Sequence, residues 1–66
     1  MPMNDIQSPQ FVLWSSRHVH LKGFTESEYD VAILEAQLLR QEGLVTEQEW
    51  IQMVRAANLL LALATS

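Results

Sequence analysis

Cysteine is absent from this sequence of 66 residues, so neither disulfides nor cysteine-based metal sites support the fold. A domain this small buries a modest fraction of its surface and is often only marginally stable alone. With disulfides excluded, association with a second copy or with another protein is the remaining aid. Since 48% of the residues are apolar, we expect a packed core in a single domain that is stabilised by dimerisation.

Basic residues are scarce, because four Lys and Arg stand against eight Asp and Glu, and the net charge is −4. A chain of this charge is repelled by a phosphate backbone unless its few cations gather on one face. Arg17 and Lys22 are close in sequence, but two cations make a small basic surface. We therefore expect an acidic protein that has no nucleic-acid partner.

Long hydrophobic runs are also absent. The apolar stretch 59–64 is far shorter than the roughly 20 residues that span a bilayer. The first residues contain no positive stretch and no apolar core, so we expect no secretory signal and no membrane partner, and a cytoplasmic location. Residues 1–9 combine two prolines with polar residues, which predicts a disordered N-terminus.

A near-repeat is the main feature that is present: Thr25-Glu26-Ser27-Glu28-Tyr29 returns as Thr46-Glu47-Gln48-Glu49-Trp50. Thr followed three residues later by Glu predicts a capping box, in which each residue's side chain bonds the other's backbone amide. Each copy is followed by a periodic apolar run, and Gly43 supplies a left-handed cap for the first run. The pattern predicts helices over 26–42 and 47–64, and the short connection makes them an antiparallel hairpin.

The segment 10–21 has a β-like composition, and we predict one extended strand there. On a strand, one face holds Phe11, Leu13, Val19 and Leu21, and the other face holds Trp14, Ser16, His18 and His20. A turn at Ser15-Ser16, which makes a short hairpin, is the alternative. The predicted fold class is therefore mainly α, an antiparallel two-helix hairpin preceded by one short β-like segment, within one domain over 10–66.

The first predicted helix has two apolar stripes, although a helix in a hairpin needs only one. One stripe, formed by Tyr29, Ala32, Ile33, Ala36 and Leu39, is expected to pack on the second helix. The other, formed by Val31, Leu34 and Leu38, lies on the opposite side. We predict that it is the dimer interface, and docking of a partner is the alternative that remains open.

Four residues of the predicted strand are candidates for contact with a partner: Trp14, Arg17, His18 and His20. Trp14 falls on the polar face and is expected to be partly exposed, and Trp and Arg are enriched at binding hot spots. His18 and His20 form a His-x-His pair, which provides two of the three or four ligands that zinc requires. No further ligands are evident, and the serines next to the histidines form no triad motif. We predict no metal, no cofactor and no enzymatic activity.

The stretch 38–50 resembles the SHOCT-type short helical hairpin, in which a Leu-rich helix ends at Gly and an aliphatic-aliphatic-Thr-acid-x-Glu-aromatic run starts the next helix. The Lys-rich continuation of that family is replaced here by Ile51-Gln52-Met53-Val54-Arg55. The resemblance implies an oligomerisation or interaction module of bacterial or mobile-element type, and it implies no activity.

These observations predict a small non-enzymatic protein-protein interaction protein. We expect a homodimeric regulator or inhibitor, of bacterial or phage type, that binds a larger protein such as a bacterial transcription regulator. One alternative is an accessory subunit of a larger complex. Another is a helix-turn-helix DNA-binding protein, which needs a basic second helix where Glu47, Glu49 and a lone Arg55 stand.

Overall fold

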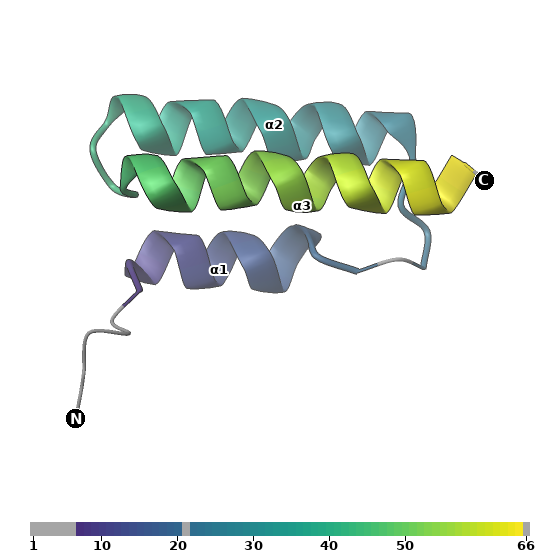
Figure 1. The fold of residues 1–66 in the computed structure, drawn as a ribbon, viewed down its shortest axis with the longest axis horizontal. Helices are drawn as coiled ribbons and strands as arrows, with labels where there is room; N and C mark the ends of the chain where they lie inside the picture. Colours follow the sequence, from purple (N-terminus) through teal and green to yellow (C-terminus); the bar gives the residue numbers. More distant parts are fainter. Residues whose placement is uncertain (1–6, 21, 66) are drawn as a thin grey trace.

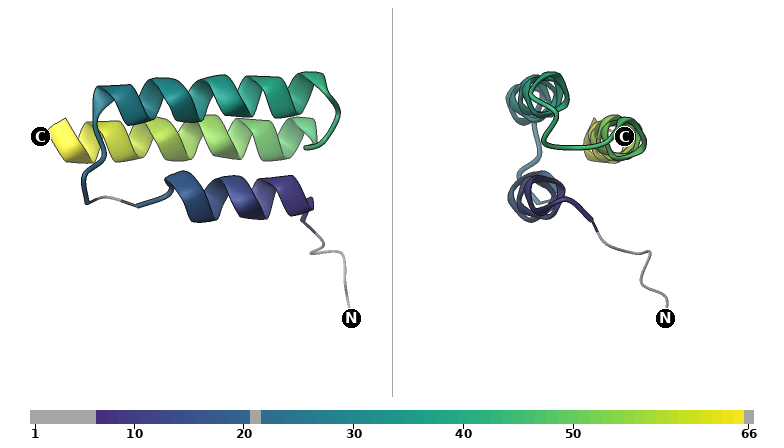
Figure 2. Two further views of the ribbon diagram at one scale, coloured as in Figure 1. Left: turned by 180° about the vertical axis from the view of Figure 1, so that it is seen from behind. Right: turned by 90° about the vertical axis from the view of Figure 1, so that its left-hand side faces the viewer.

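The computed structural model describes residues 7–20 and 22–65, which form three helices joined by short connections (Figure 1). They are α1 (Pro9–His18), α2 (Glu26–Gln41) and α3 (Glu47–Thr65). Helices α2 and α3 are antiparallel, and α1 lies against both of them, running in the same direction as α3 (Figure 1). Seen end-on, the three helices stand at the corners of a triangle (Figure 2).

The predicted fold class is wrong, because the described residues contain three helices and no strand. Most of the segment predicted as a strand over 10–21 belongs to α1. Phe11, Trp14 and His18 are the buried residues of α1, and their spacing of three and four places them on one helical face. The alternating pattern was thus a weaker signal than this helical spacing, which lets α1 bury two aromatic rings against α2 and α3.

The start of α1 falls within the segment 1–9, for which disorder is predicted. Residues 1–6 of that segment lie outside the described residues, while Ser8 is the N-cap of α1 and Pro9 is its first residue. Proline suits this position because its missing amide proton has no partner in the first helical turn. The Ser8 amide and hydroxyl both donate to the Glu49 carboxylate, at 2.8 and 2.7 Å. The helix is therefore attached to α3 at its first turn.

Helices α2 and α3 have the predicted bounds to within one residue. The predicted left-handed cap is confirmed, since Gly43 has a φ of 74°. The Gly43 amide donates to the Arg40 carbonyl at 3.1 Å, and the Leu44 amide donates to the Leu39 carbonyl at 2.9 Å. This pair of bonds is a Schellman motif, which satisfies carbonyls at the end of α2 and turns the chain toward α3.

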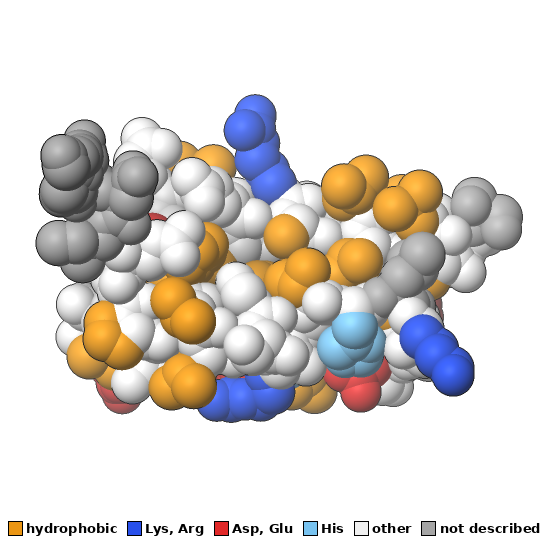
Figure 3. Space-filling view, turned by 90° about the horizontal axis from the view of Figure 1, so that it is seen from below, with side chains coloured by type: hydrophobic (Ala, Val, Ile, Leu, Met, Phe, Trp, Pro, Cys, Tyr) orange, Lys and Arg blue, Asp and Glu red, His pale blue; other side chains and the backbone are white. Residues whose placement is uncertain are grey.

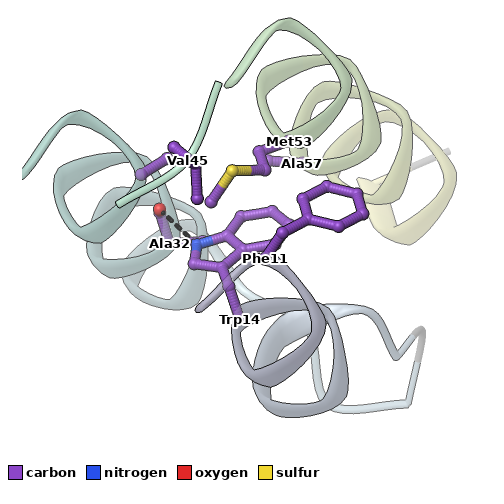
Figure 4. Packing of buried hydrophobic residues seen from close by; sticks show 7 residues of the cluster. Phe11, Trp14, Ala32, Val45, Met53 and Ala57 are labelled. Carbon is purple, nitrogen blue, oxygen red and sulfur yellow. Dashed lines mark hydrogen bonds between the residues drawn. The ribbon is translucent and has the colours of Figure 1, made fainter. Parts of the chain in front are cut away.

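The core lies between the three helices and is centred on Trp14, which points from α1 into the space between α2 and α3 (Figure 4). Its indole Nε1 donates to the Ala32 carbonyl at 2.9 Å, so the polar atom of the ring is satisfied inside the core. Met53 of α3 lies beside the ring, and small residues of α2 and α3 leave room for it (Figure 4). The buried cluster comprises Phe11, Trp14, Ala32, Ala36, Val45, Met53 and Ala57.

Candidate functional site

The α1–α2 groove is a pocket of about 200 Å³ between the first two helices. It is lined by Gln10, Trp14, Arg17, Glu35, Leu38, Leu39 and Glu42. Pockets that bind small molecules usually measure about 300–1,000 Å³. This groove is therefore smaller than the usual small-molecule site, and its mixture of apolar and charged walls suits a side chain of a docked polypeptide.

A cluster of charged and polar side chains joins α1 to α2 beside this groove. Arg17 Nη1 donates to both carboxylate oxygens of Glu35 at 3.0 Å, and His18 Nε2 lies 2.8 Å from Glu35 Oε1. Since Glu35 accepts, the imidazole carries a proton on Nε2. His18 Nδ1 is buried and has no hydrogen-bond partner among the described residues. The cluster fixes the position of α1 on α2 through the carboxylate of Glu35.

The histidine of this cluster is also part of the packing. His18 is only 4% exposed, and its ring centroid lies 5.4 Å from that of Trp14 with the ring planes tilted by 51°. Trp14 precedes His18 by four residues, so both rings project from the same side of α1. The imidazole therefore stabilises the junction of α1 and α2 and is not available at the surface.

The α2 stripe, defined as Val31, Leu34 and Leu38, lies on the side of α2 that faces away from the core. Their side chains are 51%, 57% and 48% exposed. α1 does not cover them, although the groove at one end of the stripe includes Leu38. The α2 stripe is thus an apolar helix face without a covering element in the part of the chain that the structure describes.

Further aliphatic side chains are exposed on α1, after its end and on α3. Val12 on α1, Val19 after its end, and Leu59 and Leu63 on α3 are each close to half exposed or more. Figure 3 shows one side of the molecule, where hydrophobic side chains are scattered across the surface with polar atoms between them. Single exposed aliphatic residues are normal on protein surfaces, so these residues are a less specific signal than the α2 stripe.

The structure corrects part of the predicted contact patch. Trp14 was expected to be partly exposed, but it is 1% exposed because the helical conformation of α1 turns it toward the core. His18 is buried for the same reason, and Arg17 is exposed but occupied by Glu35. Glu35, which binds both Arg17 and His18, has no sequence signal because it approaches them only when α1 docks on α2.

His20 lies apart from that cluster. Its Nδ1 is 3.1 Å from the Lys22 carbonyl oxygen, and its ring meets Phe24 edge-on with the centroids 6.3 Å apart. The two histidines therefore do not form one His-x-His site, since His18 points to Glu35 and His20 to the connection before α2. Over residues 7–20 and 22–65, no group of three or more His, Cys, Asp or Glu side chains is placed to hold a metal ion.

The chain matches no protein-family model, no curated protein and no solved structure. The SHOCT-type resemblance of residues 38–50 therefore stays a prediction that rests on the sequence pattern alone. Among the three helices that the structure describes, none has the length and apolarity that a membrane span requires.

Proposed function

We propose that this protein is a small non-enzymatic interaction protein that regulates or inhibits a larger protein by binding it through the α2 stripe. A bacterial transcription regulator is an example of such a target. The observation that carries the proposal is the exposure of Val31, Leu34 and Leu38 on a helix whose core face is already covered by α1 and α3. Contiguous exposed apolar residues on a helix are typical of protein interaction surfaces.

The groove supports the same proposal. It continues the α2 stripe beyond Leu38 and has the buried Trp14 in its wall. Its volume of about 200 Å³ suits an anchoring side chain better than a substrate or cofactor. An aliphatic surface next to a pocket of this size resembles the grooves that accept an amphipathic helix through a few anchor residues.

A homodimer is the second candidate, because a second copy is able to cover the same three aliphatic side chains. In that case self-association and capture of a larger protein compete for the α2 stripe. The DNA-binding alternative has less support, since Glu47 and Glu49 occupy the first turn of α3. The accessory-subunit alternative predicts that the chain is unstable when it is expressed alone.

The experiment is affinity capture from cells of the source organism with the wild-type chain and the double variant V31Q/L34Q, together with light scattering after gel filtration. Gln has a helix propensity similar to that of Leu and removes the apolar surface without adding charge. The matched control is Q52A/R55A, which changes the positions of α3 that correspond to Val31 and Leu34 in the repeat. We expect V31Q/L34Q to lose the captured protein and the control to retain it. Equal capture by both variants would contradict the proposal.

A further inference from the structure

We infer that the occupant of the α2 stripe is a basic amphipathic helix of another protein, whose apolar ridge lies along the stripe and whose cations meet the surrounding carboxylates. This inference rests on the proposed function, to which it adds the chemistry of the partner. Three properties of the described surface lead to it: the spacing of the aliphatic residues, the charges around them and the consequence of those charges for self-association.

The spacing suits a helix as the occupant. Val31, Leu34 and Leu38 follow one another at intervals of three and four residues, so they form a straight row about 10 Å long on α2. A helix that lies along this row contacts it with residues at the same intervals. Beyond Leu38 the row ends at the α1–α2 groove, which takes a terminal anchor residue of the docked helix.

The charges beside the row are acidic. On α2, helical spacing places Asp30 on one flank of the stripe and places Glu35 and Glu42 on the other. The Glu35 carboxylate already binds Arg17 and His18, so Asp30 and Glu42 are the carboxylates that meet the cations of a partner. The one described cation that lines the adjoining groove is Arg17, and Glu35 already holds its guanidinium. Lys22 lies in the connection before α2, Arg40 pairs with Glu47 over the Trp50 ring, and Arg55 is on α3. Lys or Arg side chains flanking an apolar ridge complement this surface.

The same charges disfavour a second copy as the occupant. In a helix pair the residues that flank the apolar row face each other across the interface. Parallel pairing of two α2 helices puts the flank with Asp30 beside the flank with Glu42 of the second copy, and antiparallel pairing puts like flanks of both copies together. Like charges juxtaposed at an interface oppose association, whereas a basic helix turns each of these carboxylates into a favourable contact.

The test uses two designed helical peptides of about 18 residues, or five turns, with the same row of Leu side chains. One peptide has Lys at the flanking positions, and the other has Glu. Binding to the wild-type chain is measured by isothermal titration calorimetry. We expect the affinity of the wild-type chain for the Lys peptide to be at least about tenfold higher than its affinity for the Glu peptide. We also expect its affinity to fall when salt is raised from about 0.1 to 1 M, because screening shortens the Debye length from about 10 to 3 Å.

Two variants separate the roles of apolar surface and charge. V31Q/L34Q keeps every carboxylate, so loss of Lys-peptide binding in this variant excludes simple attraction of a cation to an acidic protein. D30N/E42Q keeps the apolar row and is expected to bind the Lys peptide less tightly, with a smaller salt dependence. Circular dichroism of both variants must match that of the wild-type chain.

The outcomes distinguish the inference from the proposed function. Equal affinity for the Lys and Glu peptides that is lost in V31Q/L34Q overturns the basic partner and leaves the α2 stripe as a binding surface. A wild-type dimer that V31Q/L34Q converts to a monomer, with no peptide binding, identifies a second copy as the occupant and overturns the inference. A monomer that binds neither peptide overturns the inference, and the capture experiment then decides the proposed function by itself.

Discussion

The starts of α2 and α3 have nearly the same sequence but different hydrogen bonds. At α2, the Thr25 hydroxyl accepts from the Glu28 amide at 3.3 Å, and this is the one capping bond that the Glu28 and Thr25 side chains make among the described residues. At α3, the Glu49 amide donates to the Thr46 hydroxyl at 3.0 Å and the Thr46 amide donates to the Glu49 carboxylate at 2.8 Å. The complete capping box therefore occurs only where Ser8 also binds the Glu49 carboxylate.

The environment of Glu49 is reflected in its pKa. Partial burial by itself raises the pKa of Glu49, but hydrogen bonds from Ser8 and Thr46 together outweigh burial and lower it from the ordinary value of 4.5. A motif local in sequence therefore sets where both helices begin, while contacts from a neighbouring helix add to the stability of the start of α3.

The repeat also differs at its core-facing and outward-facing positions. Met53 of α3 corresponds to Ala32 of α2, and both are fully buried. Because the Trp14 indole approaches α2 closely enough to donate to the Ala32 carbonyl, α2 has a small residue where α3 has a long one. On the outward faces, Val31 and Leu34 of α2 correspond to Gln52 and Arg55 of α3. The two helices thus share the sequence of their starts and differ at these core-facing and outward-facing positions.

Met53→Ala is expected to have the largest effect, with a loss of about 2–5 kcal/mol in the free energy of unfolding. The substitution makes position 53 identical to position 32 and leaves a cavity beside Trp14. Urea denaturation followed by tryptophan fluorescence measures the effect. Gln52→Ala, at the exposed neighbouring position, is the control and should change the free energy by less than about 0.5 kcal/mol. A loss below about 1 kcal/mol for Met53→Ala would contradict the central position of Met53.

Ala32→Met makes the opposite exchange and is expected to lower the free energy of unfolding by about 1–3 kcal/mol. The longer side chain competes with the Trp14 indole for the same space and separates Nε1 from the Ala32 carbonyl. Val31→Met, one residue earlier on the exposed side, is the control in the same denaturation experiment. Equal stability of both variants would show that α1 does not pack on α2 at this position.

Glu49→Gln is expected to lower the free energy of unfolding by about 1 kcal/mol at pH 7, because it removes charge-assisted hydrogen bonds with Ser8 and Thr46. Glu28→Gln, at the corresponding position of α2, should lower it less. Since folding lowers the pKa of Glu49, this stability is present above the ordinary pKa of 4.5 and is lost as the pH falls below that value and through the pKa of the folded state.

Denaturation curves at pH 7 and at about pH 3 test this pH dependence. The difference between wild type and Glu49→Gln should shrink at the lower pH, and a difference that grows on acidification would contradict the sign of the pKa shift. Denaturation of Glu28→Gln at both pH values controls for the general effect of a carboxylate near a helix N-terminus.

V31Q/L34R transfers the outward face of α3 to α2 and is expected to have the smallest effect on stability, within about 0.5 kcal/mol of the wild-type free energy of unfolding. Both positions are about half exposed, so little packing is lost. Denaturation with urea and circular dichroism measure the change. A large destabilisation would show that the α2 stripe is covered within the folded chain, and the proposed binding surface would then be wrong.

The candidate site shows the limits of prediction from the sequence. The aliphatic row on α2 is visible as helical periodicity, so Val31, Leu34 and Leu38 were recognised as a separate stripe. A period of two in their segment predicts an exposed face for Trp14 and His18, whereas the helical period of α1 buries both. The sequence predicts no role for Glu35, because it is 18 residues from Arg17 and 17 residues from His18 along the chain.

Local sequence signals set where α2 and α3 begin and where α2 ends, because Thr25, Thr46 and Gly43 act on backbone groups within a few residues of themselves. Only the tertiary structure decided the conformation of α1. Its 10 residues are compatible with both an alternating and a helical pattern, and an isolated helix shorter than about 12–15 residues is marginal in water. Burial of Phe11 and Trp14 against α2 and α3, together with the bonds to Glu35 and Glu49, selects the helix.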